Sequence, residues 1–168
     1  MSEHHRASRP GATPERRRAE VGGERGGTGR SGAPHYDPAT VTRYLTQEWL
    51  DETRALGADQ PERPGASVRM NWVVTGGPGG DVTYYEVLHN GRVVESGLGS
   101  LADAEVTLTT SWTDSVGVAR GDLDLNAAFM QGRVKAAGHM AKLMSVLPLT
   151  KAPEYLALHE RIRAVTEF

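Results

Sequence analysis

Four runs of alternating apolar and polar residues lie between residues 68 and 112, and they limit the possible folds more than any other feature. A run with this period places every second side chain on one face of a β-sheet. A glycine-rich turn at 76–80 separates the first two runs, and the hairpin signal Asn90-Gly91 separates the second and third. Because the runs are close in sequence, they predict an antiparallel meander of VRMNWVVT, DVTYYEVLHNGR, VVESGLG and AEVTLTTSW.

The pattern changes to helical spacing after residue 112. The segments TDSVGVARG and DLNAAFMQG predict two short helices. Thr113 or Asp114 is suited to cap the first helix, and Asp124 is suited to cap the second. Gly121 and Gly132 are expected to end them.

The rest of the chain adds one strand and two helices. RVKAA predicts a fifth strand, and MAKLMSVLPL begins the next helix. A last amphipathic helix is expected from Pro153, with an apolar stripe at Tyr155, Leu158, Ile162 and Val165. This order of elements predicts an α+β fold in which a five-stranded sheet carries its helices on one face.

Ordered structure is expected to begin near residue 35. Residues 1–34 contain seven Gly, seven Arg and only one branched aliphatic residue, so they are expected to form a disordered tail. Residues 35–168 are expected to form a single domain with a C-terminal helical extension. Its first helix is predicted at 37–56, with Asp37 as cap, Pro38 in the first turn and Gly57 at the end.

The charge distribution argues against nucleic acid as a partner. The tail carries seven Arg and four Glu, whereas the remaining chain carries twelve basic and seventeen acidic residues. An acidic surface repels phosphate backbones. The tail is expected to be solvated, with at most weak, transient contact to anionic membrane surfaces. The sequence shows no cysteine, secretory signal or membrane-spanning window, so a soluble cytoplasmic protein is expected.

No catalytic or metal-binding constellation stands out. TGGPGG lacks the Gly-Lys-Ser/Thr ending of a phosphate loop and leads into a strand, so a hairpin turn is favoured. His89, His139 and His159 lack metal-ligand spacing and are interpreted as surface or boundary residues. Glu86 interrupts an apolar strand. A buried carboxyl there would be an acid or a polar anchor, but a solvent-facing position is the simpler interpretation. No enzyme activity, cofactor or metal is therefore expected.

The segment FMQGRVKAAGHMAKLMSVLPL, residues 129–149, carries the positive signal. Gly132 and Gly138 bracket a short strand, and a helix rich in Met follows without an acidic residue. Small residues leave space, and Met fills space adaptably because it is unbranched and polarisable. Such a surface suits a variable apolar ligand, and it also occurs as ordinary core packing.

This segment is similar to the sterol carrier protein type 2 domain family, which carries sequences of the kind NPxxAFFQGKLKITGNMGLAMKL. DLNAAFMQGRVKAAGHMAKLMSVL follows that pattern nearly position by position. GGPGGDVTYYEVLHNG and ADAEVTLTTSW resemble family segments and occur in the same order, so the resemblance covers about residues 66–149. It implies helices that enclose an apolar tunnel against the sheet, and non-enzymatic binding of fatty acids, acyl-CoA esters, phospholipids or sterols. The candidate ligand-binding residues that it implies are Trp72, Val74, Leu108, Trp112, Val116, Phe129, Gln131, Val134, Met140 and Met144.

The chain also departs from the family. Its last residues do not match the peroxisomal Ser-Lys-Leu signal, Arg133 replaces the lysine of the Gly-Lys-Leu motif, and a helix up to Phe168 is expected to close one end of the tunnel. Sixteen Arg against three Lys fit a GC-rich bacterial genome, which favours a fatty acyl or isoprenoid ligand over a sterol. We therefore expect a stand-alone bacterial lipid-binding or lipid-transfer protein. Two alternatives stay open: an accessory protein that presents a lipid to a partner enzyme, and an enzyme with Glu86 or His139 as acid or base.

Overall fold

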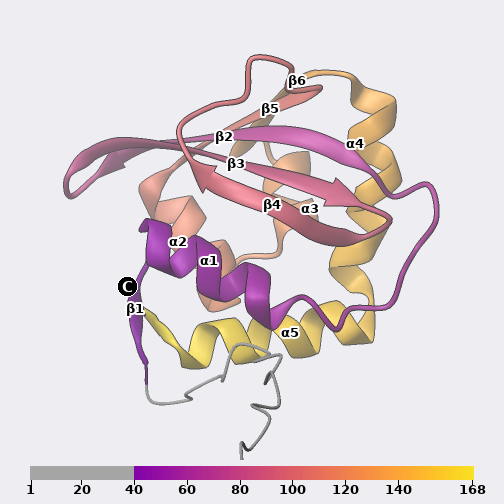
Figure 1. Ribbon diagram of the computed structural model, residues 1–168. Coiled ribbons are helices and arrows are strands. Elements are labelled where there is room, and N and C mark those ends of the chain that lie inside the picture. Colours follow the sequence, from indigo (N-terminus) through magenta and orange to yellow (C-terminus); the bar gives the residue numbers. More distant parts are fainter. Residues whose placement is uncertain (1–39) are drawn as a thin grey trace, which may run out of the picture. The chain divides into compact units, whose positions relative to one another are not determined.

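The computed structural model describes residues 40–168, and Figure 1 shows how their elements are arranged. Five strands form one sheet in the order β4-β3-β2-β5-β6. The strands are β2 (Val68–Gly77), β3 (Gly80–His89), β4 (Arg92–Leu98), β5 (Val106–Ser111) and β6 (Val134–Gly138). The helices are α1 (Gln47–Leu56), α2 (Trp112–Arg120), α3 (Leu125–Met130), α4 (Met140–Val146), the 3-10 helix η1 (Leu147–Lys151) and α5 (Pro153–Ala164). The tail expected at residues 1–34 lies outside the described residues.

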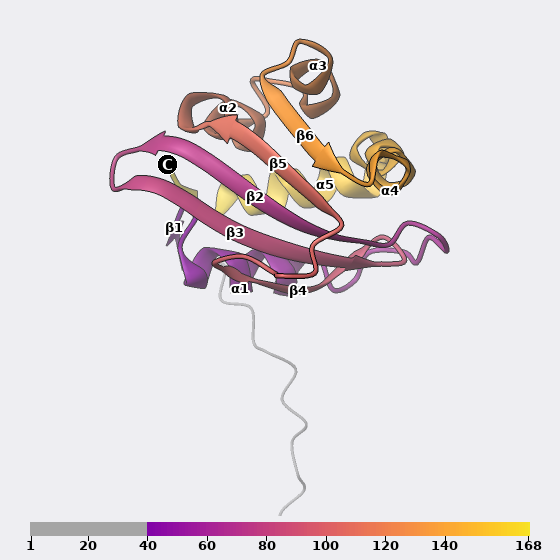
Figure 2. The ribbon, with the colours of Figure 1, turned by 90° about the horizontal axis from the view of Figure 1, so that it is seen from above.

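All the helices lie on one face of the sheet, as the views from the side and from above show (Figures 1 and 2). The α1 helix packs along β4, while α2 and α4 pack on β2 and β5. The α5 helix contacts α1, α2 and η1, so it forms a further layer beneath them. The predicted α+β class with a five-stranded sheet and helices on one face is confirmed. Within residues 40–168, no helix is both long enough and apolar enough to cross a bilayer.

Both predicted hairpins are present. The turn at Pro78-Gly79 joins β2 to β3, and the turn at Asn90-Gly91 joins β3 to β4. Asn90 and Gly91 have φ angles of 48° and 82°. A tight turn with two positive φ angles matches the twist of the strands that it joins, and Asn-Gly is the residue pair that adopts it most readily.

The predicted four-stranded meander is wrong at its last strand. β5 pairs with β2 in parallel, from Met70 opposite Val106 to Thr75 opposite Ser111. The connection from β4 to β5 therefore crosses the sheet on the face away from the helices (Figure 2). The Asn71 side chain holds this connection, since its Nδ2 donates to the Leu101 carbonyl at 3.0 Å and its Oδ1 accepts from the Leu101 amide at 2.9 Å.

The predicted start of the first helix is also wrong. Residues 37–39 lie outside the described part of the chain, and α1 begins at Gln47, after Leu45 adopts a φ of 57° that a right-handed helix excludes. The Thr46 side chain caps α1 by accepting from the Trp49 amide at 3.2 Å. The preceding strand β1 (Thr42–Arg43) pairs in parallel with β7 (Thr166–Glu167).

The predicted caps of the two short helices are correct in one case. Asp124 caps α3, and its Oδ1 accepts from the Ala127 amide at 2.9 Å. The cap of α2 is Ser111, whose Oγ accepts from the Asp114 amide at 3.1 Å, rather than Thr113 or Asp114. The strand therefore passes directly into α2, and the side chain at the junction supplies the first acceptor.

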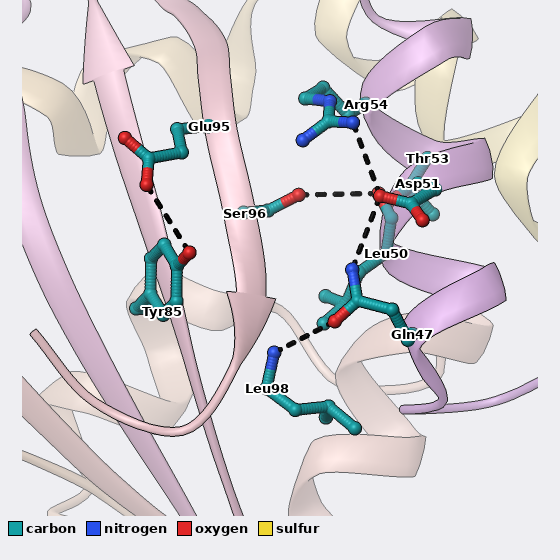
Figure 3. A network of polar contacts seen from close by, with 9 residues as sticks. All are labelled: Gln47, Leu50, Asp51, Thr53, Arg54, Tyr85, Glu95, Ser96 and Leu98. Carbon is teal, nitrogen blue, oxygen red and sulfur yellow. Dashed lines mark hydrogen bonds and ion pairs between the residues drawn. The ribbon is translucent and has the colours of Figure 1, made fainter.

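A polar network fixes α1 beside the edge strand β4 (Figure 3). The Ser96 hydroxyl donates to the Leu50 carbonyl at 3.3 Å, and the Leu98 amide donates to Oε1 of Gln47 at 3.1 Å. Asp51 then accepts from Gln47 at 3.2 Å and from Arg54 at 3.1 Å. Because the Gln47 side chain takes the hydrogen bond of a backbone amide on this edge, β4 is less available for pairing with another chain.

Candidate functional site

An internal cavity of about 150 Å³ lies between the sheet and the helices. Its lining is mainly apolar and comes from the sheet, from α3, α4 and η1, and from α5. The apolar residues are Met70, Trp72, Leu88, Val93, Leu108, Leu125, Phe129, Val134, Leu143, Val146, Leu147, Leu149, Leu158 and Ile162. A second compartment of about 130 Å³ shares eight lining residues with the first, so the two adjoin: Thr53, Trp72, Glu86, Leu125, Val134, Tyr155, His159 and Ile162.

Alternation along the strands directs one set of side chains into this space. In the register of the sheet, Met70 lies opposite Glu86, and Trp72 lies between Tyr84 and Leu108. The rings of Trp72 and Tyr84 stack, with centroids 5.9 Å apart and planes 3° apart. The sheet therefore presents a flat aromatic surface next to a single carboxyl group.

Glu86 is the carboxyl group of the cavity, and the expectation that it faces solvent is wrong. Its side chain lines both compartments, and the indole Nε1 of Trp72 donates to its Oε2 at 3.2 Å. Burial disfavours the charged carboxylate and raises the pKa of Glu86 from 4.5 to about 7, while the hydrogen bond from Trp72 counteracts part of this rise. Near neutral pH, Glu86 is therefore present in both its neutral and its negative form.

Two polar side chains of α5 face the same region. Tyr155 and His159 line both compartments, and their rings lie 4.4 Å apart, centre to centre. Burial lowers the pKa of His159, and the positive charge of Arg163 lowers it further. Burial and the charge of Glu86 raise the pKa of Tyr155. His159 was expected at the surface or at a boundary; it is partly exposed, and it lines the cavity as a predominantly neutral group at pH 7.

The second compartment ends at a buried hydroxyl pair. The Tyr44 hydroxyl lies 2.7 Å from Oγ of Ser115, and burial raises the pKa of Tyr44 to about 12. Tyr44 packs edge-on against Trp49 and Trp112, with ring centres 4.9 and 5.5 Å away. Of these three aromatic residues, Tyr44 and Trp49 line the second compartment.

The structure brings only some of the ten predicted binding residues together. Four line the main cavity: Trp72, Leu108, Phe129 and Val134. Val74 is fully buried beside it, packed with Tyr44, Trp49 and Tyr84. Trp112 and Val116 line a separate open cleft of about 610 Å³ that also contains Phe168.

The other three predicted residues lie on the surface, outside both compartments. Gln131 is the C-cap of α3 and is exposed. Met140 and Met144 lie on α4 with exposed fractions of 38% and 47%. The residues of α4 that line the cavity are instead Leu143 and Val146. The apolar run itself did not show which side of this short helix faces inward.

The sequence analysis named a buried Glu86 as a possibility but favoured a solvent-facing position, although one signal for the inward position was present. Glu86 occupies the same phase of β3 as Tyr84 and Leu88, so an inward-facing strand position was readable from the sequence. Tyr155, Leu158 and Ile162 were recognised as a stripe, and the structure shows this stripe lining the cavity along α5. Within residues 40–168, no group of three His, Asp or Glu residues is placed to hold a metal ion. The arrangement suits the enclosure of an apolar molecule that carries one polar group.

Comparison with known proteins identifies the same fold. A sequence model of the SCP-2 sterol transfer family matches residues 62–151, just over half of the chain. The crystal structure of a sterol carrier protein 2 is 17% identical, with a TM-score of 0.56, and the match covers 71% of this chain and 97% of that one. A protein from Thermus thermophilus, described as possibly sterol carrier protein, is 18% identical, with a TM-score of 0.52 and coverage of 77% and 94%.

A partial likeness to a larger enzyme also exists. The match with the sec-alkylsulfatase Pisa1 from Pseudomonas sp. is 30% identical over 51% of this chain, with a TM-score of 0.39, and it spans 13% of that enzyme. No curated protein sequence matches this chain. The family match ends at residue 151, so α5, which supplies Tyr155 and His159, lies just beyond it.

Proposed function

The chain belongs to the SCP-2 sterol transfer family, and we propose that it binds a lipid in the cavity between its sheet and α5, without catalysing a reaction. The observation that carries this proposal is the mainly apolar lining, which contains one carboxyl group among the described residues. Each buried methylene contributes about 0.8 kcal/mol, so an alkyl segment of about ten carbons gains roughly 8 kcal/mol before the ordering of chain and pocket is subtracted. Fatty acids, acyl-CoA esters, phospholipids and isoprenoid or sterol-like lipids all contain such an apolar part.

A cavity-filling substitution tests this proposal. Leu125 lines both compartments from α3, so Leu125→Trp is expected to occupy space that the lipid needs. Titration with a fluorescent fatty alcohol and a fluorescent fatty acid is expected to show saturable binding to the natural protein and at least about tenfold weaker binding to Leu125→Trp. Val94→Trp serves as the matched control, because Val94 lies on β4 with 53% of its surface exposed. Equal binding by all three proteins would place the probe outside the cavity.

The exposed methionines favour presentation to a partner as the second candidate function. Met130, Met140 and Met144 expose 82%, 38% and 47% of their surface around α3 and α4, beside the cavity wall. Exposed Met side chains adapt to varied apolar partners. A partner enzyme that binds the lipid-loaded protein is expected to lose affinity for Met130→Gln and Met144→Gln, while lipid binding stays unchanged. If this protein transfers lipid fully between vesicles in the absence of a partner protein, the result would argue for the carrier role instead.

A further inference from the structure

Glu86 lines both compartments, and within residues 40–168 it is the only carboxyl group that does so for either of them. Its Oε2 accepts from Trp72, and within residues 40–168 this is the one hydrogen bond that the carboxyl group makes. A carboxyl group has capacity for several hydrogen bonds. The unused capacity of Glu86 therefore faces the cavity, where a bound molecule can use it.

Among residues 40–168, Arg54 is the arginine or lysine that lines this space, and it is already paired with a carboxylate outside the lining. The titratable and charged groups that line the compartments beside Glu86 are Tyr44 ahead of α1, Arg54 on α1, Tyr84 on β3, and Tyr155 and His159 on α5. The Arg54 guanidinium is held by Oδ1 of Asp51 at 3.1 Å on the α1 helix (Figure 3). Burial keeps His159 predominantly neutral at pH 7, and the tyrosines are neutral as well.

The affinity of the cavity for a ligand is therefore expected to depend on the charge at the polar end of that ligand. Once Glu86 is ionised, a fatty acid carboxylate beside it would place two like charges in an apolar space, which is strongly unfavourable. A hydroxyl or carbonyl group brings no charge and can share hydrogen bonds with the carboxyl group and with the tyrosine hydroxyls. Resting on the function proposed above, we propose that the cavity selects lipids whose polar end is an uncharged hydroxyl or carbonyl group placed beside Glu86, and discriminates against lipids that end in a carboxylate.

The two uncharged groups are expected to differ in their response to pH. A hydroxyl donates to ionised Glu86 and accepts from protonated Glu86, so alcohol binding tolerates both forms. A carbonyl only accepts, so it needs the protonated form of Glu86. As pH rises and Glu86 ionises, binding of a ketone is therefore expected to weaken while binding of an alcohol is maintained.

The test is a displacement titration of the full chain with four compounds of equal chain length: a fatty alcohol, a methyl ketone, a fatty acid and a fatty amine. At about pH 8, the alcohol is expected to bind at least about tenfold more tightly than the fatty acid. In Glu86→Gln, which keeps the shape and removes the charge, the fatty acid is expected to gain affinity and the ketone to lose its pH dependence. Glu95→Gln is the matched control, because Glu95 lies exposed on the neighbouring strand β4.

The possible outcomes distinguish the selectivity proposed for Glu86 from the more general proposal that the cavity binds lipids. If the fatty acid binds as tightly as the alcohol to both the natural protein and Glu86→Gln, the selection by Glu86 is refuted while lipid binding stands. If the amine binds most tightly and loses affinity in Glu86→Gln, recognition is ionic and the proposal is overturned. If none of the four compounds binds, the function proposed for the cavity is refuted as well. The proposal is supported if the affinity for the ketone changes with pH in the natural protein but not in Glu86→Gln. This comparison needs no other variant.

Discussion

The indole Nε1 of Trp72 donates a hydrogen bond to Oε2 of Glu86 at 3.2 Å, and this contact joins two neighbouring strands inside an apolar cavity. The two side chains share one face of the sheet because β2 and β3 pair in antiparallel register. Burial holds the pKa of Glu86 at about 7, so the cavity changes from neutral to negative near neutral pH. Stability and ligand preference are therefore both expected to depend on this one residue.

Glu86→Gln is expected to stabilise the protein in mildly alkaline solution. The folded-state pKa of Glu86 is about 7 and the ordinary value is 4.5, so the folded state binds the proton more tightly than the unfolded state. The stability gained from that proton is fully present below pH 4.5 and is lost as pH rises to about 7 and above. The natural protein is expected to be less stable than Glu86→Gln by about 3 kcal/mol at alkaline pH and similar to it near pH 4.5.

Urea unfolding at several pH values measures this difference. His159 acts in the opposite direction, because its lowered pKa makes stability fall as pH drops below about 6.5. Both proteins contain His159, so the difference between their unfolding free energies isolates Glu86. A difference that stays constant from acidic to alkaline pH would contradict the burial of this carboxyl group.

Trp72→Phe is expected to raise the pKa of Glu86 further. The indole N–H stabilises the charged carboxylate, and phenylalanine keeps an aromatic ring while removing that donor. Carbon NMR of the Glu86 carboxyl group during a pH titration is the direct measurement. Trp49→Phe is the control, because Trp49 donates to the neutral hydroxyl of Thr166 at 2.9 Å and its loss leaves Glu86 untouched. An unchanged titration in Trp72→Phe would show that the hydrogen bond is not made in solution.

Leu158→Ala is expected to destabilise the protein by about 2–4 kcal/mol, because it leaves space in the wall between α5 and α1. Leu158 is 8% exposed and packs with Leu56 and Val165. Leu156→Ala on the same helix is expected to change stability by less than about 0.5 kcal/mol, since Leu156 is 52% exposed. Thermal unfolding of both variants makes the comparison. Equal losses would mean that α5 is not oriented with Leu158 inward.

The two glycines that bracket β6 are expected to tolerate alanine unequally. Gly138 has a φ of 108°, and a Cβ there would lie 2.3 Å from the backbone carbonyl oxygen of Glu105. Gly132 has a φ of 72°, and a Cβ added at Gly132 would have no other atom within 4 Å. Gly132→Ala is therefore expected to lose about 1 kcal/mol through backbone strain alone, and Gly138→Ala more than about 3 kcal/mol. Unfolding free energies of similar size would contradict the close packing of β6 against β5.

The features that the sequence predicted correctly are those that neighbouring residues determine. Period-two alternation marks the strands at Val68–Gly77 and Gly80–His89, and Asn90-Gly91 has the residue types that a tight hairpin turn requires. The Asp124 cap is equally local, since its acceptor and the Ala127 donor are three residues apart. Such features need no information about distant parts of the chain.

The features that were predicted wrongly depend on contacts between distant residues. A seven-residue connection between β4 and β5 resembles a hairpin loop in sequence. Its path across the sheet depends on contacts with distant residues, such as Leu101 with Asn71 and Asp103 with Arg69. The direction of Glu86 was readable from its strand phase, but its burial depends on α5, which packs more than sixty residues further along the chain. Composition and spacing gave no indication that Tyr155 and His159 would face that carboxyl group.

Native mass spectrometry of the gently purified full chain tests the central claim most directly. The protein is expected to carry an additional lipid mass, which solvent extraction releases for identification and which Leu125→Trp lacks. If the protein is empty and stays empty after incubation with fatty alcohols and fatty acids, the cavity does not bind lipids and the proposed function is wrong.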